Sequence, residues 1–181
     1  MKVLFVGLGS IGQRHLRNLK EISNDDYEIY AFRKTNNNLI IIDGIAKEKN
    51  SLREFYGINY APSLKKGLEL KPDIVFITNP SSLHIDVAIQ AAESGCNLFI
   101  EKPLSNSNEK IKELNNILKK KKLNATVAYQ TRFNPCFNLV KDIIAKEKFG
   151  NTKSAYFKWG TFLPDHHPYE DFRNSYAARK I

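Results

Sequence analysis

Cysteine is scarce in this sequence of 181 residues, which contains only Cys96 and Cys136. These two residues do not form a CxxC pair, and neither has a metal-ligand spacing with any of the four histidines. A disulfide framework needs more thiols, and a zinc site needs more closely spaced ligands. We therefore expect two reduced cysteines with a structural role and no metal site.

Long hydrophobic runs are also missing. The longest apolar stretches are short pieces such as LIII at 39–42 and DIVFI at 73–77, whereas a membrane-spanning helix needs about 20 apolar residues. The N-terminal stretch MKVLFVGLGSIGQRH passes quickly from apolar residues into glycines and then Arg14 and His15, unlike a signal peptide. These absences predict a cytoplasmic protein without a membrane partner.

Acidic residues are fewer than basic ones, with 19 Asp and Glu against 28 Lys and Arg, which gives a formal net charge of +9. Nucleic-acid-binding proteins gather their cations with aromatics on one face, but here the cations are scattered along the chain. The one run, KKKK at 119–122, closes a predicted helix, where cations favour the negative end of the helix dipole and stay solvated. We therefore expect no nucleic-acid partner.

Strand and helix patterns alternate along the first 130 residues. The predicted strands lie at 2–7, 27–32, 73–78, 97–101 and 125–129, with amphipathic stretches after Ser82 and Ser107. This alternation forces parallel strands with crossover helices, and continuous apolar strands are typical of sheets buried on both faces. The sequence predicts an α/β fold with a doubly wound parallel sheet, a Rossmann domain, over residues 1–130.

The motif GLGSIG at 7–12 follows the first predicted strand directly and opens a helix, which is the context that the dinucleotide fingerprint requires. Gly7 permits a tight turn, Gly9 lets backbone amides approach a pyrophosphate, and Gly12 lets the helix pack closely. A tight structural turn without a ligand is the alternative, while a P-loop is excluded because no Gly-Lys-Ser/Thr follows. The cofactor-binding residues expected here are Gly7, Gly9, Ser10, Ile11 and Gly12.

The second predicted strand does not end in the acidic residue that usually binds the adenosine ribose of NAD. That position reads AFRKTNNN, with Arg33 and Lys34. These cations can neutralise a 2′-phosphate, and Arg33 can also stack on the adenine, so the sequence favours NADP while NAD stays open. The alternative is two solvated loop cations.

The stretch FIEKPL at 99–104 raises a question, because an ammonium beside a buried strand costs free energy unless it snorkels to water or does chemistry. In a doubly wound sheet, ligands bind beyond the carboxyl ends of the strands, and EKP lies at such an end. Neighbouring residues of a strand point to opposite sides, so we expect Glu101 and Lys102 not to neutralise each other. We count Glu101 among the cofactor-binding residues and expect Lys102 to exchange a proton with an alcohol or ketone.

Four segments in this order, KVLFVGLGSIGQRH, ITNPSSLH, FIEKPLS and YQTRFNP, resemble the Gfo/Idh/MocA family of sugar and cyclitol oxidoreductases. The resemblance implies that Lys102 lies by the nicotinamide, that it orients or protonates the substrate hydroxyl, and that the Lys102–Pro103 peptide is cis. It also places Asn79, Pro80 and His84 near the cofactor, although a histidine at a helix start is as often a capping or packing residue. The implied substrate is a sugar, cyclitol or nucleotide-sugar hydroxyl or ketone.

Three residues after the last predicted strand, Tyr129, Gln130 and Arg132, are the candidate substrate residues. They do not define which sugar is bound.

Residues 131–181 are expected to be the incomplete beginning of a second, α+β domain for substrate binding or oligomerisation. A helix with Phe137, Val140 and Ile144 on one face is predicted to stop at Gly150, before one strand at 151–162. A single strand is not a sheet, so we expect this tail either to be poorly ordered or to pair with another copy in a homodimer. The resemblance implies a later catalytic histidine, and His166 and His167 do not match its motif.

Two functions of different class remain open from the sequence. The first is an NAD(P)-dependent oxidoreductase, and the second is a dinucleotide-binding module without turnover.

Overall fold

The computed structural model describes residues 1–23, 26–34, 38–42, 44–48, 51–166, 169 and 171–174. His167 lies outside these residues. The chain divides into two compact units, residues 1–128 and residues 129–181.

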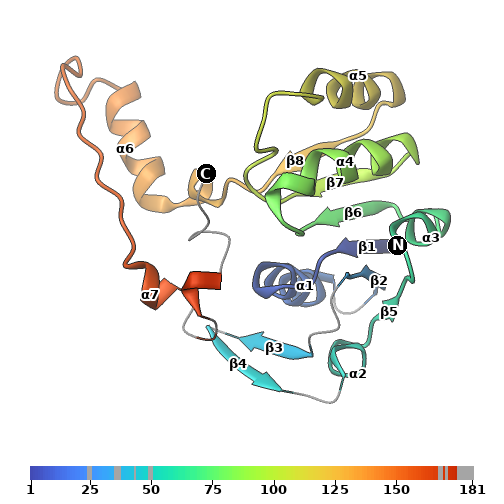
Figure 1. Cartoon of the computed structure of the whole chain (residues 1–181). Helices are drawn as coiled ribbons and strands as arrows, with labels where there is room; N and C mark the ends of the chain where they lie inside the picture. Colours follow the sequence, from blue (N-terminus) through green and yellow to red (C-terminus); the bar gives the residue numbers. More distant parts are fainter. Residues whose placement is uncertain are drawn as a thin grey trace. The chain divides into compact units, whose positions relative to one another are not determined.

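The first unit contains a six-stranded parallel sheet in the order β5-β2-β1-β6-β7-β8 (Figure 1). Its strands are β1 (Lys2–Val6), β2 (Glu28–Phe32), β5 (Asn59–Tyr60), β6 (Ile74–Ile77), β7 (Asn97–Ile100) and β8 (Ala125–Val127). The helices of this unit are α1 (Ser10–Ser23), α2 (Leu52–Tyr56), α3 (Leu64–Glu69), α4 (His84–Glu93) and α5 (Ile111–Lys121), with a 3-10 turn η1 (Ser81–Leu83) before α4. The predicted doubly wound parallel sheet is confirmed.

The two faces of the sheet carry separate hydrophobic clusters because strand side chains alternate. In β1, Leu4 and Val6 pack with residues of α4 and α5, whereas Val3 and Phe5 pack with Leu16 of α1 and with the α2 region. Helices on both faces explain why every strand of the sheet centre is almost entirely apolar.

An antiparallel hairpin of β3 (Leu39–Ile42) and β4 (Ile45–Glu48) lies beside α1, on the side of the sheet that α1 covers (Figure 1). Neither this hairpin nor the two-residue strand β5 is predicted from the sequence. The run LIII was too short to tell a strand from a helix segment by periodicity, although the dipeptide DG at 43–44 is a hairpin signal.

Of the two cysteines, Cys96 has the buried, structural position expected from the sequence, whereas Cys136 does not. Both are free, with Cys96 buried and Cys136 exposed. Burial, and to a smaller extent the charge of Asp73, raises the pKa of the Cys96 thiol to about 11. Cys96 is therefore a protonated, unreactive core residue at neutral pH.

The second unit contains η2 (Gln130–Phe133), α6 (Pro135–Ala145), α7 (Leu163–His166) and η3 (Phe172–Asn174). The helix predicted in this region is confirmed, but it ends before Gly150, and Glu147 already has a left-handed φ of 48°. Its apolar face is largely open, since Leu139, Val140 and Ile144 are about half exposed.

The strand predicted at 151–162 is wrong, because this segment has no regular secondary structure. An isolated strand leaves its backbone groups unpaired, and the described residues of the second unit offer no neighbouring strand. Consequently Tyr156, Phe157 and Trp159 are each more than three-quarters exposed. The expected homodimer through this segment stays a prediction.

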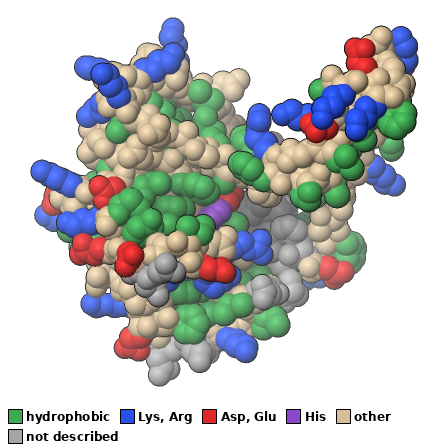
Figure 2. Space-filling model, turned by 180° about the vertical axis from the view of Figure 1, so that it is seen from behind, with side chains coloured by type: hydrophobic (Ala, Val, Ile, Leu, Met, Phe, Trp, Pro, Cys, Tyr) green, Lys and Arg blue, Asp and Glu red, His purple; other side chains and the backbone are tan. Residues whose placement is uncertain are grey.

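The charged side chains of the surface form separate groups. Figure 2 shows Lys and Arg side chains on one face interrupted by hydrophobic and acidic side chains. Within the part of the chain that the structure describes, no helix has the length and hydrophobicity to span a membrane.

Candidate functional site

The carboxyl ends of the central strands lie in one row across the sheet. Register pairs Phe32 of β2 with Val6 of β1, Val6 with Ile77 of β6, and Ile77 with Ile100 of β7. The backbone ladder continues one residue further, because the N–H groups of Gly7, Thr78 and Glu101 donate to Phe32, Val6 and Ile77 at 2.9, 3.0 and 2.9 Å. The segments that carry the candidate residues therefore begin at one edge of the sheet.

The order of the strands reverses between β1 and β6. From β1 the chain moves through β2 to β5 on one side, and from β6 it moves through β7 to β8 on the other (Figure 1). Such a switch point is where open α/β sheets bind their ligands. Gly7 and Thr78 are the first residues beyond β1 and β6, so the glycine-rich turn lies at the switch point.

Two of the three motif glycines are required by the packing of the chain itself. A Cβ on Gly7, whose φ is +99°, would lie 2.8 Å from the Asn79 backbone nitrogen. A Cβ on Gly12 would lie 2.7 Å from the Gly7 carbonyl oxygen and 2.8 Å from Thr78 Oγ1. Gly12 thus lets α1 approach the turn closely, as predicted from the motif.

Gly9 differs from its neighbours. A Cβ there would meet no protein atom within 4 Å, and its φ lies outside the left-handed region. No packing within the described residues explains a glycine at this position. Ser10 opens α1 and Ile11 is 36% exposed, so the turn and the helix N-terminus face open space. The N-terminus of a helix with accessible amides suits a pyrophosphate.

Asn79 provides a second sign that a ligand group is accommodated at this edge. Its side-chain oxygen is buried and has no hydrogen-bond partner among the described residues. A buried acceptor without a donor costs roughly 1–3 kcal/mol. A dinucleotide brings ribose hydroxyl and carboxamide donors, so the residues present fit such a group.

His84, the first residue of α4, connects two of the strand ends. It is 1% exposed, its Nδ1 lies 2.7 Å from the Pro103 carbonyl oxygen, and its Nε2 lies 2.8 Å from the Asn79 carbonyl oxygen. His84 therefore has the packing role that was the alternative to a functional one, because its ring holds the EKP segment against the residues after β6. Pro80, which follows Asn79 in the sequence, is exposed and precedes η1.

Glu101 and Lys102 have different surroundings, as expected for neighbours at a strand end. The Glu101 carboxylate is buried, with Oε1 2.8 Å from His15 Nε2 and Oε2 accepting the Lys102 backbone N–H at 2.9 Å. Lys102 is exposed. The Lys102–Pro103 peptide is cis, as the resemblance implies.

Electrostatics favour the ionised form of Glu101. Burial is the largest influence and acts to raise the pKa of this carboxyl, but the hydrogen bonds from His15 and from the Lys102 N–H, together with the charges of these two residues, hold the pKa below its usual value. The His15 ring also packs edge-on against Phe99, with ring centroids 4.9 Å apart. Sequence reasoning missed His15, and its place one helical turn after Gly12 is the signal that could have found it.

Arg33 and Lys34 lie directly beyond β2. Arg33 is half-buried and its Nη1 donates to the Tyr60 hydroxyl at 3.3 Å, while Lys34 is exposed. The hydrogen bond from the Gly7 N–H to the Phe32 carbonyl joins this corner to the glycine-rich turn. Two cations therefore follow the strand that pairs with β1.

The candidate substrate residues belong to the second unit. Tyr129 is 47% exposed, and Gln130 and Arg132 in η2 are also exposed.

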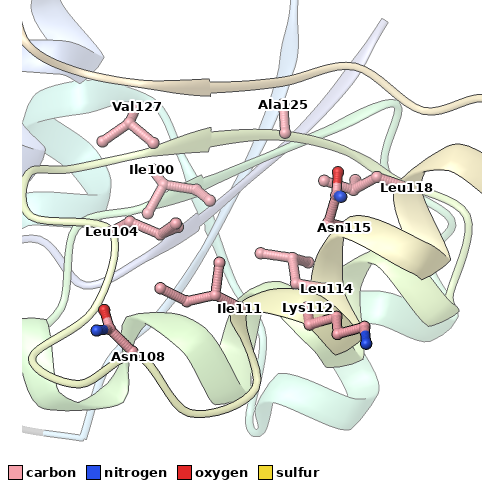
Figure 3. Close-up of a pocket in the computed structure, with 10 residues that line it drawn as sticks. All are labelled: Ile100, Leu104, Asn108, Ile111, Lys112, Leu114, Asn115, Leu118, Ala125 and Val127. Carbon is pink, nitrogen blue, oxygen red and sulfur yellow. The ribbon is translucent and has the colours of Figure 1, made fainter.

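The first unit also contains a hollow of about 540 Å³, which lies elsewhere. Figure 3 shows Ile111, Leu114 and Leu118 of α5 facing Ile100 and Val127 of the strands. The lining is mostly apolar, with Lys112 as its charged member. It is a gap in the packing of α5 on the sheet and has no group suited to catalysis. Among the described residues there is also no cluster of His, Cys, Asp and Glu that could hold a metal ion.

Comparison with known proteins agrees with this geometry. A family model described as "GFO_IDH_MocA: Oxidoreductase family, NAD-binding Rossmann fold" matches residues 1–129. Levoglucosan dehydrogenase of Pseudarthrobacter phenanthrenivorans is 38% identical over 96 residues, which cover 52% of this chain and 24% of that protein. The scyllo-inositol 2-dehydrogenase (NAD(+)) of Bacillus subtilis is 36% identical over 86 residues, which cover 48% of this chain and 25% of that protein.

The fold also matches solved structures. The WlbA dehydrogenase from Chromobacterium violaceum, determined in complex with NADH and UDP-GlcNAcA, superposes with a TM-score of 0.69 at 26% identity. The match covers 83% of this chain and 41% of that one. The chain thus spans less than half the length of each of these three proteins.

Proposed function

Because the chain belongs to the Gfo/Idh/MocA oxidoreductase family, with its NAD-binding Rossmann fold, we propose that it binds NADP(H) and takes part in oxidising or reducing a sugar-like hydroxyl or ketone. The observation that carries the proposal is that an open Gly9 turn and the Lys102 segment, which His84 holds against the residues after β6, lie at one edge of the sheet. The orphaned Asn79 oxygen between them supports a ligand with hydroxyl or amide donors.

Each group at this edge has a role in the proposal. The α1 N-terminus and the amides near Gly9 hold the pyrophosphate, and Asn79, Pro80, His84 and Glu101 shape the floor beside the nicotinamide. When bound, the cofactor supplies hydride transfer to or from the substrate carbon. Lys102 takes the hydroxyl proton as an alcohol is oxidised and returns it as a ketone is reduced.

The proposed preference for NADP(H) depends on the corner after β2. Arg33 and Lys34 stand where an NAD-binding domain usually has an acidic residue. A 2′-phosphate brings negative charge and acceptor oxygens to this corner, and a guanidinium binds them through charge-assisted hydrogen bonds.

The proposed substrate class is a sugar, cyclitol or nucleotide-sugar hydroxyl or ketone, and Tyr129, Gln130 and Arg132 stay candidate substrate residues. The names of the three relatives support this class, because they refer to an anhydrosugar, a cyclitol and a nucleotide sugar. A cytoplasmic location remains a prediction.

A second candidate is a dinucleotide-binding module without turnover. It is favoured by the second unit, whose described residues form no sheet and bury no side chain. Hydride transfer requires a substrate held in near-attack geometry, and exposed residues provide little restraint.

Titration calorimetry with NADPH and NADH tests the binding part of the proposal. NADPH is expected to bind more tightly, and replacing Arg33 and Lys34 together by Ala should weaken NADPH binding by roughly tenfold while changing NADH little. Equal or tighter binding of NADH by the unmodified chain would refute the NADP preference, and no binding of either would refute the cofactor site.

Nicotinamide absorbance with polyols, inositols and nucleotide sugars tests turnover. In a chain that turns over, Lys102→Ala should lower kcat by at least about 100-fold with NADPH affinity retained, whereas Lys112→Ala on α5 should change neither. Tight NADPH binding without any turnover would favour the binding module.

A further inference from the structure

Gln13 is a buried residue of α1 whose amide makes every hydrogen bond available to it. It is 1% exposed. Its Nε2 donates to the Leu8 carbonyl at 3.2 Å and to the Leu39 carbonyl at 2.9 Å. Its Oε1 accepts the Ile41 backbone N–H at 2.9 Å and the Tyr56 hydroxyl at 3.1 Å. One amide thereby joins the glycine-rich turn, α1, β3 and α2.

Arg17, one helical turn further along α1, reinforces the same contact. Its Nη1 donates to the Ile41 carbonyl at 3.0 Å and lies 2.9 Å from the Tyr56 hydroxyl. The hairpin strand β3 is therefore held on α1 by both its Ile41 N–H and its Ile41 carbonyl. Such satisfied buried networks fix a unique arrangement of the elements that they join.

Hydrogen bonds from the glycine-rich turn and from α1 hold Phe32, where β2 ends, and Leu39, where β3 begins. The Phe32 carbonyl accepts the Gly7 N–H at 2.9 Å. The Leu39 carbonyl accepts from Gln13. The two donors, Gly7 and Gln13, belong to the glycine-rich turn and to the start of α1. Arg33 and Lys34 lie between Phe32 and Leu39 in the sequence.

We propose that Gln13 is a positioning residue for cofactor selectivity, which holds the Arg33–Lys34 corner at a fixed place relative to the glycine-rich turn. The inference rests on the proposed function, since it concerns the 2′-phosphate of the same dinucleotide. Gln13 itself does not touch the cofactor, because its amide is fully engaged by the chain.

The physical reason is that the 2′-phosphate and the pyrophosphate are attached to the same ribose, so the distance between these two groups varies little. If Arg33 and Lys34 move relative to the glycine-rich turn, they contact the 2′-phosphate for only part of the time that the turn holds the pyrophosphate. The affinity for NADPH then falls. NADH lacks the 2′-phosphate and is less sensitive to the position of the corner. Selectivity, rather than binding in general, should therefore depend on Gln13.

The test compares Gln13→Leu with Tyr56→Phe in the full chain. Gln13→Leu removes the hydrogen bond to Leu39 together with the bonds to Leu8 and Ile41, whereas Tyr56→Phe removes a hydroxyl from the same network and leaves the bond to Leu39 in place. Calorimetric titration should show the NADPH-to-NADH affinity ratio falling by about tenfold in Gln13→Leu and unchanged in Tyr56→Phe. If Gln13→Leu does not fold, Gln13→Met serves instead, since it keeps an unbranched side chain and has no N–H donor for the Leu39 carbonyl.

Hydrogen exchange without cofactor gives an independent measurement. The amides of Leu39 and Ile41 should exchange faster in the Gln13 variant, and the backbone of Arg33 and Lys34 should follow, while Leu114→Ala in the opposite core should leave both slow. An unchanged affinity ratio or unchanged exchange at Arg33 and Lys34 would overturn this inference alone. Equal affinity for both dinucleotides in the unmodified chain would overturn the proposed preference and the inference with it.

Discussion

At the scale of single residues, Glu101 shows how the site is held together. Its two carboxylate oxygens are divided between the His15 ring and the Lys102 backbone N–H. A buried carboxylate is stable only when such donors replace its water. The acid of the EKP motif therefore fixes the backbone at Lys102 and ties β7 to α1, while the lysine side chain stays exposed.

The pKa of Glu101 leads to a prediction about pH. Its folded-state pKa lies below the usual value of about 4.3, so its contribution to the free energy of unfolding is complete above that value and is lost as pH falls through the folded pKa. Glu101→Gln should lower the unfolding free energy by roughly 1–2 kcal/mol at neutral pH. The difference from the unmodified chain should shrink in acid.

Urea unfolding of both chains at neutral pH and below the folded pKa provides the measurement. Replacing Glu69, an exposed carboxylate paired with Lys66, by Gln is the control and should have little effect. A Glu101→Gln deficit that stays the same at both pH values would contradict the assignment.

At the scale of elements, the glycine-rich turn contains one glycine that the packing of the chain requires, Gly12, and one that only a ligand would require, Gly9. Gly12→Ala should destabilise the chain by roughly 1–3 kcal/mol, because its Cβ would press on the Gly7 carbonyl and on Thr78. Gly9→Ala meets no protein atom, so its melting temperature should be unchanged while NADPH affinity falls by at least about tenfold. Thermal unfolding together with calorimetry distinguishes the two variants, and unaltered NADPH binding by Gly9→Ala would argue against a pyrophosphate at the turn.

The elements also show what a sequence can reveal. The strands that form the sheet centre are continuous apolar runs, and the turn at residues 7–12 lies between a strand and a helix, so both could be predicted locally. The network around Gln13 could not, and the only local signal for the hairpin of β3 and β4 was the dipeptide DG at 43–44. Gln13 meets partners 26 and 28 residues away along the chain, and nothing near Gln13 in the sequence marks them.

At the scale of the whole molecule, the two units differ in how they are stabilised. The first has a hydrophobic cluster on each face of its sheet. In the second, the described residues contribute no buried side chain. The strand predicted at 151–162 does not form, because a segment with aromatic residues such as Tyr156, Phe157 and Trp159 becomes a strand only when a neighbouring strand pairs with it and its side chains are buried.

This difference predicts that the units lose structure separately. Backbone amides of β1, β6 and β7 should be strongly protected from hydrogen exchange, because they lie in the sheet centre, whereas amides at 151–162 should exchange almost at once. Limited proteolysis should first cut this exposed segment and leave a core that binds NADPH as tightly as the intact chain. If residues 151–162 are protected only at high protein concentration, two copies of the chain pair through this segment. Protection of these residues at every concentration would contradict the prediction that the two units lose structure separately. Because the proposed cofactor site consists of the glycine-rich turn and strand ends of the first unit, NADPH should slow exchange around residues 7–12 without protecting 151–162.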